Sequence, residues 1–179
     1  MEDLRNRVLG TGDIQGKLKD LAGKIPGFGG YLTKDSRRDA DKLLREHLAR
    51  KLEAERKRLR DVATKVGPTN LQLVGRIDKS VTRLQTVTDK IKTASYGMAS
   101  FFDAARVGEK QLDALYTYDN SMLEGVPPLT AAIGDLAKAV KIKPPATDSI
   151  DEALDAVSAA VDQLATAWNL RQDVILQAG

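Results

Sequence analysis

The sequence predicts an all-α protein, an elongated antiparallel four-helix bundle with an amphipathic helical segment at its N-terminus. Apolar residues recur at alternating steps of three and four over most of the chain, and period-two alternation is almost absent. Short clusters of Gly, Pro, Asn and Asp separate the periodic stretches. The chain has 179 residues, which is enough for one core. Because each periodic stretch carries only a narrow apolar stripe, the helices are expected to cover one another.

The first expected element is the N-terminal segment, residues 1–32. Ile14, Leu18, Leu21 and Ile25 form a short apolar stripe with lysines beside it. Several glycines weaken any isolated helix here, so the segment needs a surface to lie on. One interpretation is that it docks on the bundle or on a neighbouring subunit. The other is that it lies at a membrane interface, which lysines beside an apolar stripe favour.

A corner rich in glycine and aromatic residues ends this segment, with the sequence IPGFGGYL. Phe28 and Tyr31 are expected to plug the end of the bundle before the next helix begins. A P-loop is excluded, because Lys34 follows the glycines too late and no strand precedes them. The alternative is an interaction surface made by the aromatic residues and the basic residues of the next helix. The candidate surface comprises Phe28, Tyr31, Lys34, Arg37, Arg38, Arg56, Lys57, Arg58 and Arg60.

The bundle itself is expected over residues 33–179, with short connections that make neighbouring helices antiparallel. Thr69 or Asn70 is the expected N-cap of the second helix. In the third helix, the run from Gly125 to Pro128 predicts a kink or a brief interruption. The four helices are expected at about residues 35–66, 70–107, 109–142 with a break near 127–128, and 148–177.

The charges are divided unevenly along the chain. The net charge is +3, yet residues 1–108 carry a balance of +9 and residues 109–179 a balance of −6. This division predicts a dipolar molecule or two halves that pack together. Only the basic half is a plausible phosphate partner. Its first long helix also contains acids at i+3 and i+4 spacing, which favours a solvated face over a nucleic-acid surface. These acids are Asp39, Asp41, Glu46, Glu53 and Asp61.

Polar residues interrupt the apolar seams at a few positions. Glu55 and Asp119 both lie on such seams, where they could form an acid/base pair or bind a cation. Residues of this kind more often make one polar layer that fixes the register between helices. The candidate polar core layer comprises Glu55, Thr88, Ser95, Asp119 and Arg171.

The usual catalytic constellations are missing from the sequence. With one His and no Cys, the chain cannot supply a two-histidine zinc site, a thiolate site or the paired Glu-x-x-His motifs of a di-iron bundle. No G-x-S-x-G motif occurs. We expect no enzymatic activity, no cofactor, no small-molecule substrate and no tightly held transition metal.

The expected location is cytoplasmic, with a peripheral membrane position as the alternative. No stretch of about 18 consecutive apolar residues is present, and the N-terminus lacks the apolar core of a signal peptide.

Two stretches also resemble a known family. IPGFGGYLTKDSRRDADKLLREHLA and TASYGMASFFDAARVGEKQLDALYTYD are similar to the opening and middle blocks of a family of uncharacterised all-helical bacterial proteins, over about residues 24–126. The resemblance implies a helical fold and a bacterial source. It implies no activity, cofactor or site residue.

Together these observations favour a non-enzymatic scaffold or adaptor that acts through protein–protein contacts or self-association. The first alternative is a peripheral protein that holds an anionic membrane with its N-terminal segment and basic helix. The second is weak nucleic-acid binding by the same helix, which is disfavoured for the reason given above.

Overall fold

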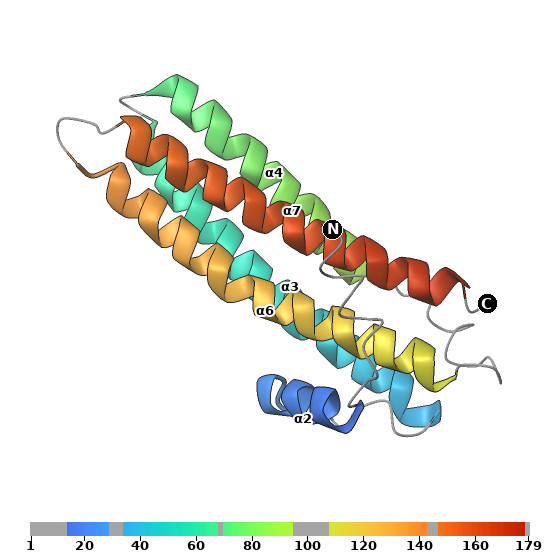
Figure 1. The fold of residues 1–179 in the computed structure, drawn as a ribbon. Helices are drawn as coiled ribbons and strands as arrows, with labels where there is room; N and C mark the ends of the chain where they lie inside the picture. Colours follow the sequence, from blue (N-terminus) through green and yellow to red (C-terminus); the bar gives the residue numbers. More distant parts are fainter. Residues whose placement is uncertain (1–13, 29–33, 68–69, 95–107, 143–146, 178–179) are drawn as a thin grey trace.

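The computed structural model describes residues 14–28, 34–67, 70–94, 108–142 and 147–177, and these ranges contain five helices and no strand (Figure 1). The all-helical class predicted from the apolar periodicity is thereby confirmed. The helices are α2 (Ile14–Lys24), α3 (Lys34–Val66), α4 (Leu71–Thr93), α6 (Glu109–Ala139) and α7 (Thr147–Gln177).

Two antiparallel helical hairpins, α3 with α4 and α6 with α7, make up the body of the molecule. In the first hairpin Glu53 pairs with Lys92 whereas the later Arg56 bonds the earlier Gln85, so the two helices run in opposite directions. In the second hairpin Asp119 pairs with Arg171, and a Cβ on Gly125 would touch Leu164. The two helices of each hairpin therefore run in opposite directions.

The two hairpins pack against each other through helices that run in the same direction. Arg76 and Arg83 of α4 pair in order with Asp151 and Asp162 of α7. On the other side, Glu55 of α3 accepts a hydrogen bond from Thr130 of α6, and α3 and α6 ascend together in Figure 1. The expectation of antiparallel neighbours thus applies to consecutive helices, while contacts between the hairpins are parallel.

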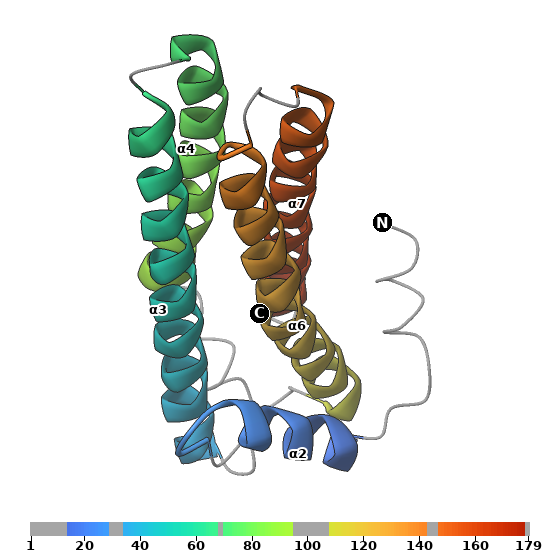
Figure 2. The same cartoon turned by 90° about the vertical axis from the view of Figure 1, so that its left-hand side faces the viewer.

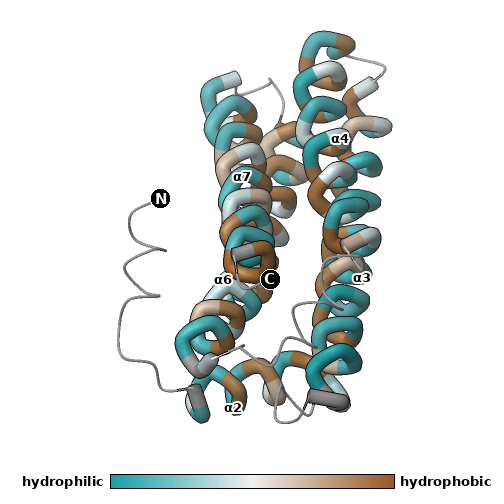
Figure 3. The backbone as a smooth tube through the Cα atoms, turned by 90° about the vertical axis from the view of Figure 1, so that its right-hand side faces the viewer, coloured by the Kyte–Doolittle hydropathy of each residue, from teal (hydrophilic) through white to brown (hydrophobic). Residues whose placement is uncertain are grey.

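The apolar seams meet in one core that runs along the bundle. Leu48 and Leu52 of α3, Leu84 of α4, Leu129 of α6 and Val157 of α7 are all fully buried. Figure 3 shows hydrophilic segments alternating with hydrophobic ones along each helix, the pattern expected of amphipathic helices. At the start of α4, the Asn70 side chain accepts a hydrogen bond from the Leu73 amide at 2.9 Å, which confirms Asn70 as the N-cap.

Helix α6 continues through Pro127 and Pro128, so the expected interruption is absent. A proline has no N–H, and each one therefore removes the intrahelical donor for the carbonyl four residues earlier. Both prolines are exposed, while the flanking residues Val126 and Leu129 are buried in the core. Core packing of these flanking residues holds the helix together across the prolines. Figure 2 shows that the axis of α6 bends along its length.

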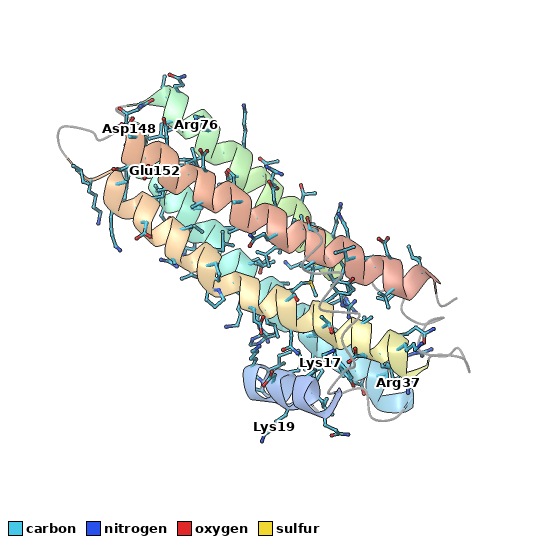
Figure 4. All side chains as sticks on the ribbon, in the orientation of Figure 1. Lys17, Lys19, Arg37, Arg76, Asp148 and Glu152 are labelled. Atoms are coloured by element: carbon cyan, nitrogen blue, oxygen red, sulfur yellow. The ribbon has the colours of Figure 1, made fainter. Side chains whose placement is uncertain are left out.

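Helix α2 lies beside the bundle, against the first half of α6, where its lysines pair with Asp113 and Glu124 (Figures 1 and 2). Leu21, Ile25 and Phe28 are buried there and belong to the core. Lys17 binds Asp113 of α6 at 2.5 Å. Figure 4 shows Lys17 between α2 and α6 and Lys19 directed away from the bundle. Residues 14–28 thus dock on the bundle, as the first of the two interpretations expects.

Replacing Gly75 with alanine should raise the free energy of unfolding by about 0.5–1 kcal/mol. Gly75 is exposed inside α4, and a Cβ built on it meets nothing within 4 Å. In contrast, a Cβ on Gly125 would lie 2.9 Å from Leu164 Cδ2 in the packed interface of α6 and α7. Gly125→Ala should therefore destabilise the protein. Urea unfolding of the two variants tests the pair, and equal effects would contradict the close packing of α6 on α7.

Candidate functional site

A groove between α3 and α6 is a concave surface made by described residues. Its volume is about 820 Å³. Lys24, at the end of α2, lines it as well, so three helices contribute to its walls. We call it the α3–α6 groove. It is lined by Lys24, His47, Lys51, Ala54, Glu55, Leu123, Glu124, Val126, Pro127, Thr130 and Ala131.

The groove exists because small side chains face each other where the two helices run side by side. Ala54 of α3 and Ala131 of α6 leave space that longer side chains would fill, and both are exposed. Leu123, Val126 and Pro127 give the α6 wall an apolar character. An apolar hollow with a few polar groups at its edge is the usual form of a binding site, and bundles often place such sites between helices.

The two acids of the groove are already engaged. Glu55 accepts hydrogen bonds from Arg58 Nη1 and Thr130 Oγ1, each at 2.8 Å. Glu124 accepts one from Lys24 Nζ at 3.2 Å. By contrast, Lys51 is exposed and makes no hydrogen bond or ion pair with any residue that the structure describes. One positive charge on the α3 wall is therefore left without a partner.

His47 lies one helical turn before Lys51 on the same wall. Its Nε2 atom is shielded from solvent, and no hydrogen bond reaches it. Burial lowers the pKa of His47 below its ordinary value, and the positive charges of Lys51 and Arg50 lower the pKa further. The imidazole is therefore neutral at pH 7, and its Nε2 stays unsatisfied within the described part of the chain.

A buried ionic cluster lies beside the groove, nearer the end of the bundle where α3 and α6 begin. Arg171 of α7 is fully buried and donates from Nε to Asp119 of α6 at 2.5 Å and from Nη2 to Asp41 of α3 at 2.6 Å. Arg45 donates to the other oxygen of Asp41 at 2.8 Å. Its Nη1 also lies 3.4 Å from the carbonyl oxygen of Lys92, at the end of α4. This set, the Arg171 network, connects all four helices of the bundle.

The arrangement of the Arg171 network is well suited to burial. Two carboxylates and two guanidinium groups balance in charge, and Arg171 also lies over the Trp168 ring, with its Cζ 5.4 Å from the ring centroid. Buried ion pairs persist when their geometry is good and their remaining hydrogen-bonding groups are satisfied. Arg171, Asp119 and Asp41 are enclosed and paired, and Arg45 is half-buried at the edge of the network.

The predicted polar layer is split in the structure. Asp119 and Arg171 do come together, and Asp41 joins them, although its spacing had placed it among the solvated acids. The available signal was that Asp41 continues the α3 apolar seam one step toward the N-terminus. Glu55 is 14 residues further along α3, or about 21 Å at the helical rise, and so lies in the groove.

The other two members of the predicted layer are not part of the network either. The Thr88 hydroxyl donates to the carbonyl of Leu84 in its own helix, at 2.7 Å. Ser95 lies outside the described residues.

The predicted interaction surface is likewise not one surface. Phe28 belongs to the core, and Tyr31 and the side chain of Lys34 lie outside the described part of the chain. Arg37 is half-buried near the start of α3, where Figure 4 marks it, and Arg38 is exposed.

The remaining basic residues of this surface point in different directions around α3. Arg56 donates to Gln85 of α4, while Arg58 turns toward the groove and bonds Glu55. Lys57 and Arg60 are exposed to solvent. These basic residues are therefore distributed around the helix and do not share one face. Sequence reasoning missed the α3–α6 groove because its walls come from distant parts of the chain.

Glu55→Leu should leave the free energy of unfolding unchanged or raise it by up to about 1 kcal/mol. The Glu55 side chain is 10% exposed, so leucine gains apolar burial at this position. Its main partner, Arg58, has a side chain that is 46% exposed and can turn to water. Thermal unfolding with a parallel measurement of association state tests this. A clear loss of stability would mean that the Glu55 contacts outweigh the cost of burying the charge.

Within the described ranges, no group of three or more His, Asp or Glu side chains is placed to hold a metal ion. None of the described helices combines the length and apolar character that crossing a lipid bilayer requires. Comparison with known proteins found no matching family model, no matching curated protein and no matching solved structure.

Proposed function

We propose that the protein is a non-enzymatic helical adaptor or scaffold, and that it holds a segment of a partner protein in the α3–α6 groove. The observation that carries this proposal is the groove itself, about 820 Å³ in volume. Its α6 wall is apolar, and its α3 wall holds a lysine that pairs with no residue in the described ranges. Such a hollow gives a partner apolar contact area and a polar group that fixes orientation.

The Arg171 network supports the same proposal from inside the bundle. It links α3 to both helices of the second hairpin, and so restrains the two walls of the groove relative to each other. Preorganised walls reduce the ordering cost of binding. An adaptor needs a binding groove whose walls are held in place, and the Arg171 network beside the groove provides this.

The experiment is site-specific photocrosslinking in the cells that make the protein. A photoreactive phenylalanine analogue would replace Ala54 or Ala131, which are exposed in the groove, or Ala156, which is exposed on α7. We expect a discrete crosslinked product from both groove positions and none from the control. If the groove positions give no product, or if Ala156 gives the same one, the proposal is wrong.

The peripheral membrane alternative requires the apolar residues of α2 to be free for lipid. Their burial in the core counts against it, since Leu21 is fully buried and Ile25 is 1% exposed. Sedimentation with anionic liposomes at two salt concentrations separates the alternatives, because the adaptor should remain in the supernatant at both. The nucleic-acid alternative is weakened by the dispersal of the α3 basic residues and by the engagement of Arg56 and Arg58.

A further inference from the structure

We infer that the occupant of the α3–α6 groove is a short amphipathic helix of the partner, with a carboxylate that lies against Lys51 and His47. This inference rests on the proposed function and names the chemistry of the partner. Three features carry it: the charge balance of the walls, the dimensions of the lining and the unsatisfied nitrogen of His47.

The charge balance selects an acidic group. Glu55 is neutralised by Arg58, and Glu124 by Lys24, so the groove offers no unpaired negative charge. Lys51 has no partner among the residues that the structure describes, and Arg50 is its exposed neighbour on α3. Complementary charge fixes the register of a partner and suppresses wrong partners. An Asp or Glu side chain at this point supplies the missing charge.

The dimensions select a helix of about two turns. The lining runs from His47 to Glu55 on α3 and from Leu123 to Ala131 on α6. Each span covers nine residues, which are about 12 Å long at the helical rise. A helix that fills a groove of this length has anchors at i, i+3 or i+4, and i+7. Its apolar face would meet the apolar α6 wall, and its acidic residue would face α3.

His47 predicts how this binding depends on pH. In the free protein, burial and the charges of Lys51 and Arg50 lower its pKa. The other charged groups of the groove are Lys24 from α2 and Glu124 from α6, which pair with each other, and Glu55, which Arg58 neutralises. A partner carboxylate beside His47 raises the pKa of the imidazole. The complex then binds more protons than the free protein, so affinity rises as the pH falls.

The test is a display selection with the full-length protein and a library of 16-residue helical peptides. Apolar residues occupy the anchor positions, and the remaining positions are randomised. Wild-type protein should enrich peptides with Asp or Glu at one fixed position relative to the anchors. Lys51→Glu should shift that position to Lys or Arg. Lys57→Glu, an exposed change on the outer side of α3, should leave the selection unchanged.

The selected peptide is then titrated at pH 7.5 and pH 5.5, where its own carboxylate stays mostly ionised. Wild-type protein should bind more tightly at pH 5.5, by up to about tenfold for a rise of one unit in the His47 pKa. His47→Gln should remove this gain while the protein still binds at pH 7.5. A gain that persists in His47→Gln would overturn the role of the imidazole.

Three outcomes overturn the inference. If the peptides are enriched without an acidic position, the groove binds a partner, and only the carboxylate that we assign to that partner is wrong. If the acidic preference survives in Lys51→Glu, the carboxylate lies elsewhere. If no peptide is enriched and the protein forms a dimer that Lys51→Glu dissociates, the occupant is a second copy of this chain. Failure of the adaptor proposal is recognised separately, by photocrosslinking that yields no partner at Ala54 and Ala131.

Discussion

Arg171→Met should lower the free energy of unfolding by about 3–5 kcal/mol, the range for removing one partner of a buried ion pair. Methionine leaves the carboxylates of Asp119 and Asp41 enclosed, at 0% and 1% exposure, without their shared cation. Arg45 still reaches Asp41, whereas the principal cation of Asp119 is lost. Urea unfolding followed by circular dichroism measures the effect.

The matched control is Arg76→Met. Arg76 pairs with Asp151 between α4 and α7, but the two side chains are 40% and 44% exposed. Exposed ion pairs contribute between about 0 and 1 kcal/mol, so this variant should change stability little. Adding Asp119→Leu to Arg171→Met should recover part of the loss, because Asp41 keeps Arg45 as its partner and the enclosed charge of Asp119 is removed. Equal effects of Arg171→Met and Arg76→Met would show that the network does not stabilise the fold.

Phe28→Ala should also cost about 3–5 kcal/mol, the range for truncating an aromatic core residue. Phe28 is 6% exposed and belongs, with Leu21 and Ile25, to the core that residues 14–28 form with the bundle. The turn that places it uses Gly27 at φ +79°, a backbone conformation that other residues rarely adopt. Thermal unfolding measures the loss, and hydrogen exchange in α2 reports whether this helix detaches first.

Leu71→Ala serves as the control for Phe28→Ala. Leu71 is a large apolar residue that is 80% exposed, so its truncation should be nearly neutral. The contrary result is a Phe28→Ala protein of normal stability, together with anionic-liposome binding by the full chain that disappears when the chain starts at Thr33. That combination would assign Phe28 to a membrane anchor.

The helical class could be predicted because the period of the apolar residues is a local property of the sequence. The N-cap at Asn70 is local in the same sense, since its acceptor and the Leu73 amide are three residues apart. Of the kink or brief interruption expected in α6, the interruption is absent, because local chemistry competes with packing. Pro127 and Pro128 disfavour a helix, but the burial of Val126 and Leu129 on the same turns outweighs them.

The candidate site could not be predicted, because it depends on how distant helices align. The spacing of apolar residues shows which face of a helix points inward. It does not show which residues of a neighbouring helix that face contacts. Glu55 and Asp119 therefore looked like one layer, although Glu55 lies beside Thr130 and Asp119 beside Arg171. The groove depends on the same alignment, since it brings Ala54 opposite Ala131.

The Arg171 network also has a kinetic consequence. Within each hairpin the contacting residues are close in sequence, so α3 with α4 and α6 with α7 can form early. Asp41 and Arg171 are separated by 130 positions, and their bond requires both hairpins to be in place. The network should then form after the folding transition state, and its main effect should be to lower the rate of unfolding. We expect its loss to speed unfolding far more than it slows folding, which would make this cluster the determinant of how long the bundle survives under stress.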